Sequence, residues 1–405
     1  MPDVGIVMPV YTQKPEFLAA ALQSILNQTY DNYVLIIVID GDANMHKLCQ
    51  AIVRDDPRVQ YVLNETNQGV AKALNRGFDV LYRNRSIEYL TWISSDNLYS
   101  PYFIEVLRRA LHTSAVQVGL VYSSFRTIDQ QGTLVHGEKE LALQRHYQSR
   151  SKEHLLDSCI VGVSFMYRAR DAKQIEGYGL EPVEDYDYWL RLTEHCDTKY
   201  VPIELMDYRT CSELSISATL QSKERHRYWR FAYHTARYRA RSRRGIPSEL
   251  TIVYALAEAD EKAVARLESL YEQSYSNYQV FFIDLSADGS ATEVLSQIAH
   301  PTFAPIKRPG MAKDLAVLSY IEKVRTPYTM VLGPEPFGST LDLEVLLNEM
   351  SKAPPHLSAN YYTDNRLVGY RSDFVYYDSY EDQLFRTEKL VQLLRFQQKE
   401  GERGS

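Results

Sequence analysis

Residues 90–97 read Leu-Thr-Trp-Ile-Ser-Ser-Asp-Asn. Apolar and β-branched residues give way abruptly to a short polar cluster that contains one carboxylate, Asp96. This pattern predicts a buried strand that delivers Asp96 to the edge of a sheet. Open α/β sheets bind their ligands at the carboxyl ends of their strands, so Asp96 is a candidate site residue. A lone aspartate after a strand is also a common helix-cap or turn residue, so the assignment depends on the strands that precede it.

Buried strands and amphipathic helices alternate before this stretch. Strands are predicted over residues 4–10, 33–39 and 59–63, and helices over residues 16–28 and 70–82. Such alternation indicates an α/β fold, in which a parallel sheet is covered by helices on both faces.

The composition narrows the class of protein. A length of 405 residues predicts two or three domains, and a hydrophobic content of 45% is enough for sizeable cores. The net charge of −7 gives no sign of a nucleic-acid partner. No run of about 18 uncharged apolar residues is present, so no membrane span is expected. The chain enters a strand at once, without a signal peptide, and its four cysteines are scattered, so we expect a reduced, cytoplasmic protein.

A nucleotide is the natural ligand for the predicted sheet, but the sequence contains neither the dinucleotide fingerprint nor a Walker A string. The turn after the first strand lacks the Gly-x-Gly-x-x-Gly fingerprint, which leaves a dinucleotide oxidoreductase as a weak alternative. The polar candidates follow three strands instead: Pro9 and Tyr11, Asp40 and Asp42, and Ser94, Ser95 and Asp96.

Four strings carry a resemblance to a known family. They are Met-Pro-Val-Tyr at 8–11, Ser-Ile-Leu-Asn-Gln-Thr-Tyr at 24–30, Ile-Asp-Gly-Asp at 39–42 and Asn-Gln-Gly-Val-Ala-Lys-Ala-Leu-Asn at 67–75. In order and spacing they resemble the family 2 glycosyltransferases, which are inverting enzymes with the GT-A fold. Residues 95–101 are most similar to the spore-coat polysaccharide type. The resemblance covers residues 4–215 and implies a mixed, mostly parallel sheet with helices on both faces.

The resemblance also implies a nucleoside diphosphate sugar as donor, with uridine as the expected base. Tyr11 would stack on the base, beside Pro9, and Asp40 would accept a hydrogen bond from the edge of the base. A buried polar edge that is left unpaired is costly, so such a pair discriminates between bases. The other implied donor-binding residues are Asp42, Asn67, Gly69, Lys72, Asn75, Ser94 and Ser95. Asp42 is equally suited to a turn and Lys72 to a solvated helix face.

A divalent cation, Mn²⁺ or Mg²⁺, is the implied cofactor, and Asp96 matches the metal-binding aspartate of the family. Hard cations prefer carboxylate and phosphate oxygens. The family usually has two acids here, whereas this sequence has Ser94 or Ser95 at the first position. Residues 208–215 match a segment that often supplies a histidine to the metal, and this segment contains none.

The catalytic candidates lie in the string Val-Glu-Asp-Tyr-Asp-Tyr-Trp-Leu-Arg-Leu at 183–192. This string matches the start of a helix in the family. Inverting transfer needs one carboxylate to accept the proton of the attacking hydroxyl, and we assign this role to Asp185. Glu184 would place the acceptor or the base. Acids are also enriched in the first turn of helices, so capping is the structural alternative.

The predicted function is the transfer of one sugar from a nucleotide-diphosphate sugar to a hydroxyl acceptor in glycan or polysaccharide biosynthesis. The acceptor, whether a glycan, a lipid-linked or a protein hydroxyl, is left open, and so is a homo-oligomer. The missing first acid motivates an alternative of a different class, a non-catalytic assembly protein that binds sugar nucleotides or glycans.

Residues 223–244 form a basic stretch with interleaved aromatic residues. It predicts an amphipathic helix with a solvated face, or else a contact with an anionic membrane surface, a lipid-linked acceptor or an acidic partner. Residues 225–229 do not meet the Gln/Arg-x-x-Arg-Trp string of processive synthases, so we expect single-sugar transfer.

The second half of the chain echoes the first. Residues 267–278 echo residues 22–33, and residues 310–315 echo residues 69–74. In this alignment Pro334 falls on Asp96, with Glu335 as the only nearby acid. We therefore expect four segments: a catalytic domain at 1–222, a basic helical linker at 223–247, a degenerate GT-A-like repeat at 248–350, and a C-terminal extension and helix at 351–405. A pair of active domains is the minor alternative.

Overall fold

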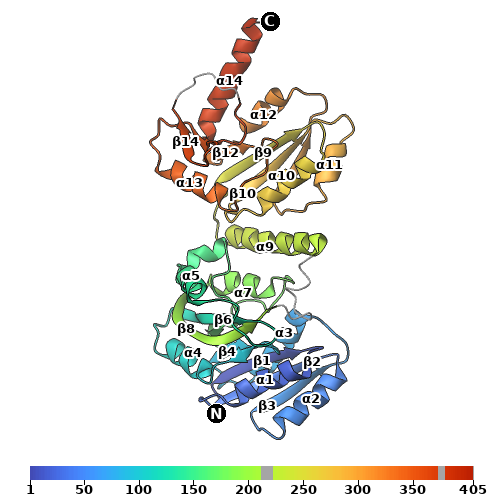
Figure 1. Ribbon diagram of the computed structural model, residues 1–405, viewed down its shortest axis with the longest axis vertical. Helices are drawn as coiled ribbons and strands as arrows, with labels where there is room; N and C mark the ends of the chain where they lie inside the picture. Colours follow the sequence, from blue (N-terminus) through green and yellow to red (C-terminus); the bar gives the residue numbers. More distant parts are fainter. Residues whose placement is uncertain (211–221, 373–378, 405) are drawn as a thin grey trace. The chain divides into compact units, whose positions relative to one another are not determined.

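A computed structural model describes residues 1–210, 222–372 and 379–404. The chain divides into two compact units, Met1–Ala236 and Arg237–Ser405, which are blue to green and yellow to red in Figure 1. The part of the 208–215 string that begins at Cys211 lies outside the described residues.

The first unit contains the predicted alternation of strands and helices. Its strands are β1 (Val4–Val10), β2 (Tyr33–Asp40), β3 (Val59–Asn64), β4 (Tyr89–Trp92), β5 (Leu98–Tyr99), β6 (Val118–Ile128), β7 (Phe165–Arg168) and β8 (Asp197–Arg209). Its helices are α1 (Pro15–Leu26), α2 (Ala43–Val53), α3 (Val70–Tyr82), α4 (Phe103–His112), α5 (Glu138–Gln148), the 3₁₀ helix η1 (Lys152–Leu156), α6 (Ala169–Ala172) and α7 (Glu184–Leu192).

The described strands of this unit form one mixed sheet in the order β3-β2-β1-β4-β7-β6-β8-β5. Strands β3, β2, β1 and β4 run parallel, and β7 is antiparallel to both β4 and β6. The predicted class, a mixed and mostly parallel sheet, is confirmed. Strand β4 is shorter than predicted, because it ends at Trp92 and the chain bends at residues 95–96.

Helices cover both faces of this sheet. One face of β1 and β2 packs with α1, α2 and α4 in a single apolar core that includes Ile6, Leu22 and Leu107. Helix α3 covers the other face, where Gly77 permits close approach: a Cβ at this position would lie 2.5 Å from a methyl carbon of Val7. The buried runs of β1 and β2 follow from this cover on both sides.

The second unit also forms one sheet, in the order β11-β10-β9-β12-β15-β13-β14 for the described residues. Its strands are β9 (Leu250–Leu256), β10 (Tyr278–Asp284), β11 (Phe303–Lys307), β12 (Tyr328–Val331), β13 (Ala359–Tyr362), β14 (Val368–Arg371) and β15 (Leu384–Arg386). Its helices are α10 (Glu261–Tyr271), α11 (Ser290–Leu295), α12 (Lys313–Ile321), α13 (Asp342–Lys352) and α14 (Thr387–Gly404). Strands β13 to β15 belong to the segment expected to form an extension, and here they pair within the sheet.

Counted across the sheets from β3 and from β11, the first six strands have the same arrangement and the same directions. The two units also share buried hydrogen bonds. Gln28, after α1, donates to the carbonyl of Ser100 at 2.7 Å and accepts from the N–H of Ile104 at 3.0 Å. Gln273, after α10, makes the corresponding two bonds at 2.8 and 3.0 Å. Both amides fix the start of a later helix against an earlier one, so the second unit repeats the framework of the first.

An arginine that ends the antiparallel strand is repeated as well. Arg168 of β7 donates to the carbonyl of Leu111 in the last turn of α4 at 2.6 Å. Arg386 of β15 donates to the carbonyl of Ala353, which ends α13, at 2.9 Å. Helix ends leave carbonyls without partners in the helix, and both arginines satisfy one of them.

The strand register corrects the alignment of the two halves by one residue. Strands β4 and β12 begin with Tyr89 and Tyr328, each paired with the first residue of the neighbouring central strand. Asp96 follows Tyr89 by seven residues, and Glu335 follows Tyr328 by seven residues. Glu335, and not Pro334, is therefore the residue that corresponds to Asp96. The similarity of single letters was misleading, whereas backbone pairing fixes the correspondence.

The basic stretch forms helix α9 (Lys223–Arg243), and the boundary between the units falls within it. Arg230, Arg237 and Arg241 are 4, 4 and 6% exposed, so these cations are withdrawn from solvent. Arg241 donates to the hydroxyl of Ser276 at 2.9 Å. A membrane or partner contact through this stretch stays a prediction. In the described ranges, none of the helices combines the length and the apolar character needed to cross a bilayer.

The shared glutamine predicts matched losses of stability. We expect Gln28→Ala and Gln273→Ala each to destabilise their own unit by about 2–4 kcal/mol, because buried partners lose their hydrogen bonds. Chemical denaturation with a probe in each unit measures this. The exposed Gln131→Ala serves as the control. A loss no larger than that of the control would contradict the shared role.

Candidate active site

A cavity of about 580 Å³ lies at the carboxyl edge of the first sheet. The ends of β1, β2, β4 and β8, the start of α3 and the start of α7 all contribute to its wall. Ten of the predicted site residues line it: Pro9, Tyr11, Asp40, Asn67, Gly69, Ser94, Ser95, Asp96, Glu184 and Asp185. Asp96 and Asp185, which are 89 positions apart in the sequence, therefore face one common space.

The turn after β4 holds the carboxylate of Asp96. The hydroxyl of Ser94 donates to Oδ1 of Asp96 at 2.5 Å, and Ser95 accepts from the amide of Gln13 at 3.3 Å. Asp96 is 8% exposed. Burial raises its pKa, and the Ser94 hydrogen bond and the positive charge of Arg209 oppose this. A cation bound here would stabilise the ionised form.

Asp40 fixes the loop between β3 and α3. Its carboxylate accepts from the amide of Asn64 at 2.6 Å and from the backbone N–H groups of Gln68 and Gly69 at 3.0–3.1 Å. The side chain is almost fully buried while it still borders the cavity. Much of its hydrogen-bonding capacity therefore serves the loop that carries Asn67.

Gly69 begins α3 with φ +88°, a left-handed conformation that favours glycine. A Cβ at this position would also lie 2.8 Å from Oε1 of Glu181, which accepts from the N–H of Ala71 at 3.0 Å. Glu181 thus places its negative charge at the positive end of α3, inside the same cavity.

The two catalytic candidates open α7. Oδ1 of Asp185 accepts from the N–H of Tyr186 at 2.6 Å, and Asp185 is half-buried. Burial raises the pKa of Asp185, and this hydrogen bond opposes the rise. Glu184 is 6% exposed. Burial, followed by the negative charge of Asp185, raises the pKa of Glu184 to about 8. Aromatic packing orients the helix, since Trp189 lies 4.4 Å from Phe165 between ring centroids.

Three predicted donor-binding residues lie outside this cavity. Asp42 caps α2 by accepting from the N–H of Asn44 at 2.9 Å, as its turn alternative anticipated. Asn75 ties α3 to the backbone of Tyr178 through two hydrogen bonds of 2.7 and 2.8 Å. Lys72 is exposed and lines a neighbouring cavity of about 470 Å³ beyond the Asn64 loop.

Other lining residues went unpredicted. Arg209 of β8 is 5% exposed, and its guanidinium donates to the carbonyls of Asp96, Asp129 and Gln130 at 2.9–3.1 Å. Trp229 of α9 borders the cavity and stacks on Tyr233 at 5.0 Å. The aromatic residues within the basic stretch were the available signal for Trp229. Arg209 lies in the 208–215 string that matched a family segment, whereas Gln13 and Glu181 carry no signal in the sequence.

The donor set around Asp96 suits a hard cation. Its carboxylate and the nearby serine hydroxyls offer oxygen only, and the burial of the carboxylate calls for positive charge. Across the part of the chain that the structure describes, no cluster of three or more His, Cys, Asp or Glu side chains could hold a metal alone. Magnesium-type sites often use one or two carboxylates together with substrate phosphates, and this arrangement fits that mode.

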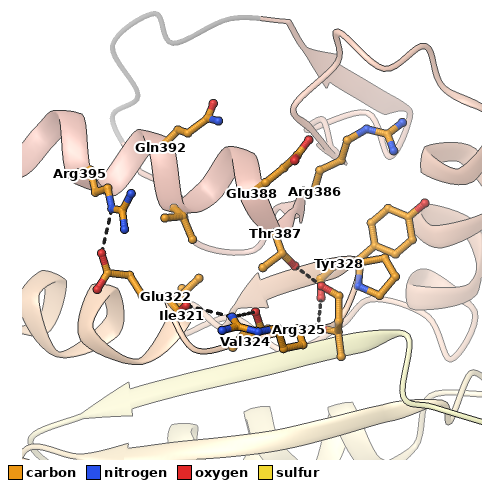
Figure 2. Close-up of a pocket in the computed structure, with 13 residues that line it drawn as sticks. Ile321, Glu322, Val324, Arg325, Tyr328, Arg386, Thr387, Glu388, Gln392 and Arg395 are labelled. Carbon is orange, nitrogen blue, oxygen red and sulfur yellow. Dashed lines mark hydrogen bonds and ion pairs between the residues drawn. The ribbon is translucent and has the colours of Figure 1, made fainter.

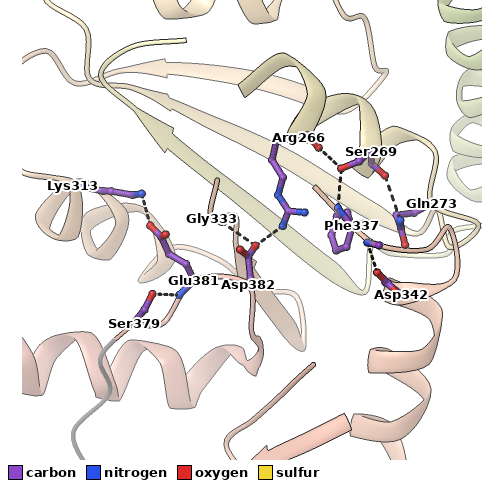
Figure 3. A network of polar contacts seen from close by, with 11 residues as sticks. Arg266, Ser269, Gln273, Lys313, Gly333, Phe337, Asp342, Ser379, Glu381 and Asp382 are labelled. Carbon is purple, nitrogen blue, oxygen red and sulfur yellow. Dashed lines mark hydrogen bonds and ion pairs between the residues drawn. The ribbon is translucent and has the colours of Figure 1, made fainter. Parts of the chain in front are cut away.

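The carboxyl edge of the second sheet carries a polar network instead (Figure 3). Arg266 of α10 is 2% exposed and forms an ion pair with Asp382. The N–H of Gly333, just after β12, donates to the same carboxylate at 2.9 Å, and Lys313 pairs with Glu381. Residues 381 and 382 thus occupy the carboxyl edge of the second sheet. The equivalent edge of the first sheet borders the cavity.

A groove of about 570 Å³ lies where β12 begins and β15 ends (Figure 2). Arg325, Arg386 and Arg395 line it, but each guanidinium is engaged by the chain. Arg395 pairs with Glu322 at 2.8 Å, Arg325 donates to the carbonyl of Glu322 at 3.2 Å, and Arg386 donates to the end of α13.

Comparison with known proteins agrees with this geometry. Residues 5–175 match the model of glycosyl transferase family 2. An uncharacterized glycosyltransferase of Rickettsia felis is 28% identical over 194 residues, which are 47% of this chain and 31% of that protein. Glycosyltransferase GlyG of Streptococcus pneumoniae is 33% identical over 105 residues, or 26% of this chain and 33% of that protein. The matches thus span about a third of the length of these relatives.

Two solved structures overlap with part of the fold. A mannosyltransferase from Pyrobaculum calidifontis, in complex with GDP-Man and Mn²⁺, has a TM-score of 0.42 and 13% identity, covering 60% of this chain and 64% of that one. Staphylococcus aureus TarS, in complex with UDP-GlcNAc, has a TM-score of 0.43 and 12% identity, covering 58% and 66%. The family match falls entirely within the first unit and runs from β1 to β7, so this part of the chain is similar to glycosyl transferase family 2.

Proposed function

We propose that the first unit transfers one sugar, with inversion, from a nucleoside diphosphate sugar to a hydroxyl acceptor. The observation that carries this is the shared cavity, in which the strand-end residues Tyr11, Asp40 and Asp96 meet the helix-start acids Glu184 and Asp185. Donor-binding residues on one wall and an acid on another are what a direct displacement needs. Uridine remains the expected base.

Asp185 is the proposed base. The acceptor oxygen forms a bond to the anomeric carbon while its proton passes to the Asp185 carboxylate. The bond from that carbon to the phosphate oxygen breaks, and the diphosphate leaves with the bonding electrons. A carboxylate with a raised pKa is the stronger base, provided that it is ionised at the working pH. Transfer should therefore fall on the acid side, as Asp185 becomes protonated.

The charge of the cavity supports a need for a divalent cation. Five described lining residues are acidic, namely Asp40, Asp96, Glu181, Glu184 and Asp185, while Arg209 is cationic. A nucleoside diphosphate brings further negative charge, so binding to these residues alone would be repulsive. Asp96 would hold the cation, which when bound would neutralise the departing diphosphate.

For the second unit we propose a non-catalytic role in packing, dimerisation or acceptor docking. The ion pair of Arg266 with Asp382 fills its sheet edge, and Glu335 stands exposed at the position equivalent to Asp96. The alternative function for the whole chain, a non-catalytic sugar-nucleotide-binding or glycan-binding assembly protein, predicts binding without turnover.

A panel of nucleoside diphosphates tests the donor. With Mn²⁺ present, we expect one base to raise the melting temperature most, because a ligand that binds only the folded state stabilises it. At about 100 times the dissociation constant the gain is roughly 2.7 kcal/mol. The matching nucleotide sugars are then assayed for product. Binding without product from any donor and acceptor pair would favour the assembly-protein alternative.

Asp185→Asn tests the base. We expect transfer to fall by about 10²–10⁴-fold, since the amide cannot accept the proton, while the melting temperature stays close to that of the wild type. Initial rates on the identified donor measure this. Asp79→Asn, at an exposed position on α3, is the control. Unchanged turnover in the Asp185 variant would reject the assignment.

Asp96→Asn and Glu335→Gln form a matched pair across the two units. We expect the first to remove the effect of Mn²⁺ on donor binding and nearly all transfer, and the second to leave both intact. Calorimetric titration of the nucleotide with and without Mn²⁺ measures binding. About half of the transfer remaining in Asp96→Asn would indicate a second active unit.

A further inference from the structure

One cationic side chain stands among the acids of the cavity. Arg209, the last residue of β8, is the only Lys or Arg among the described residues that line it. Lys72, which the family resemblance implied for the donor, lines the neighbouring cavity instead. A diphosphate that entered this space would therefore meet positive charge from the described lining at a single side chain.

The guanidinium of Arg209 is anchored by three carbonyls and one aromatic ring. Its Nε donates to the carbonyl of Asp96 at 3.1 Å, and its Nη1 donates to the carbonyls of Asp129 and Gln130 at 2.9 and 3.0 Å. Its central carbon lies 4.2 Å from the ring centroid of Phe17, within the range of a cation–π interaction. These contacts hold the planar group in place, so its remaining nitrogen has a fixed direction.

That remaining nitrogen, Nη2, is available to a ligand. Among the described residues it has no hydrogen-bond partner, and it is not one of the unpartnered polar atoms that are closed to solvent. The side chain as a whole is only 5% exposed, and it borders the cavity. A charged donor that is held in position and left open calls for an anionic acceptor, with which it forms a strong hydrogen bond.

The same contacts place Arg209 next to Asp96 without joining the two charges. Arg209 binds the backbone carbonyl of Asp96, while Oδ1 of the Asp96 carboxylate accepts from the hydroxyl of Ser94. The backbone N–H of Arg209 also donates to Oδ1 of Asn97 at 2.9 Å. Two hydrogen bonds therefore fix the end of β8 to residues 96 and 97. A diphosphate held near Asp96 would lie in the part of the cavity that Arg209 borders.

We infer that Arg209 donates a hydrogen bond from Nη2 to a phosphate oxygen of the donor and stabilises the diphosphate as it leaves. The inference rests on the proposed function and adds a catalytic residue on the donor side. When the bond between the anomeric carbon and the phosphate oxygen breaks, its electron pair stays on that oxygen. The guanidinium keeps its protons throughout and offsets the growing negative charge from a position that is already fixed.

A purely structural role is the alternative, because Arg209 also satisfies three carbonyls. Arg168 of β7 is a matched control for this role. It is half-buried, it donates to the carbonyls of Val118 and Leu111 at 2.9 and 2.6 Å, and it is not part of the cavity lining. Arg209→Met and Arg168→Met each remove such contacts, and their melting temperatures measure that loss. Only the first variant would also remove a phosphate contact.

Binding of a nucleoside and of its diphosphate separates the two roles. The probes carry the base that stabilises the full chain most, and calorimetry gives their dissociation constants in EDTA and with Mn²⁺. We expect Arg209→Met to weaken binding of the diphosphate roughly 10–100-fold and to leave the nucleoside almost unchanged, because one charge-assisted hydrogen bond is lost. Arg168→Met should keep the wild-type ratio of the two constants. General damage to the fold affects both probes and cancels in this ratio.

Turnover gives a second measurement. We expect kcat of Arg209→Met to fall about 10²–10³-fold, the usual cost of one fixed donor at a developing charge. Guanidinium ion, added below denaturing concentrations, should restore part of the rate of Arg209→Ala and none of the rate of Asp185→Asn. If Arg209→Met does not fold, Arg209→Lys carries the binding comparison. Lysine keeps the charge but lacks the planar fork, so we expect a smaller loss of diphosphate binding in the same direction.

The outcomes distinguish this inference from the proposed function. If the wild type prefers the diphosphate to the nucleoside and the Arg209 variants keep that preference in full, Arg209 is structural and the inference alone fails. If no nucleoside diphosphate binds the wild type more tightly than its nucleoside, the proposed function and the inference fail together. Rescue of Arg209→Ala by guanidinium ion, together with a reduced ratio, would support the contact.

Discussion

The parallel pairing of β1 with β2 on one side and with β4 on the other is the constraint on which the site depends. Because the three strands run in the same direction, they end at the same edge. Their ends bring Tyr11, Asp40 and Asp96 to one cavity from separate parts of the chain. The buried apolar runs of β1 and β2 secure this pairing, since helices cover both faces of these strands.

Later segments of the chain, in β8, α7 and α9, complete the lining of the cavity. Arg209 lies at the end of β8 and donates to the backbone carbonyls of Asp96, Asp129 and Gln130. Helix α7 presents Glu184 and Asp185 from the far wall, and Trp229 adds an aromatic surface from α9. Acidic residues dominate the result. A negatively charged ligand would be repelled by these acids unless positive charge accompanies it or some of the acids are neutral.

The sequence predicted the framework better than the roles of single side chains. Strong periodicity and buried runs placed α3 at the residues where it lies and β1 to β3 within a residue at each end. Motif similarity selected ten donor and catalytic candidates that lie together in one cavity. It could not tell that Asp42 caps a helix or that Asn75 ties a loop, because these roles depend on the local backbone. Glu181 and Arg209 were missed since only tertiary contacts make them neighbours of Asp96 and Gly69. The one-residue error at Glu335 arose because matching letters carry less information than strand register.

The repeated amide contacts of Gln28 and Gln273 have a consequence for how such a chain evolves. These glutamines lie away from the reactive edge, yet the two halves keep them while the residues at the edge have diverged. The bonds that hold the framework are therefore separate from the polar groups at the edge of the sheet. A framework that is held by its own internal bonds can carry different polar groups at the edge of its sheet, and so the second unit offers a platform on which a new surface or a new specificity could be selected.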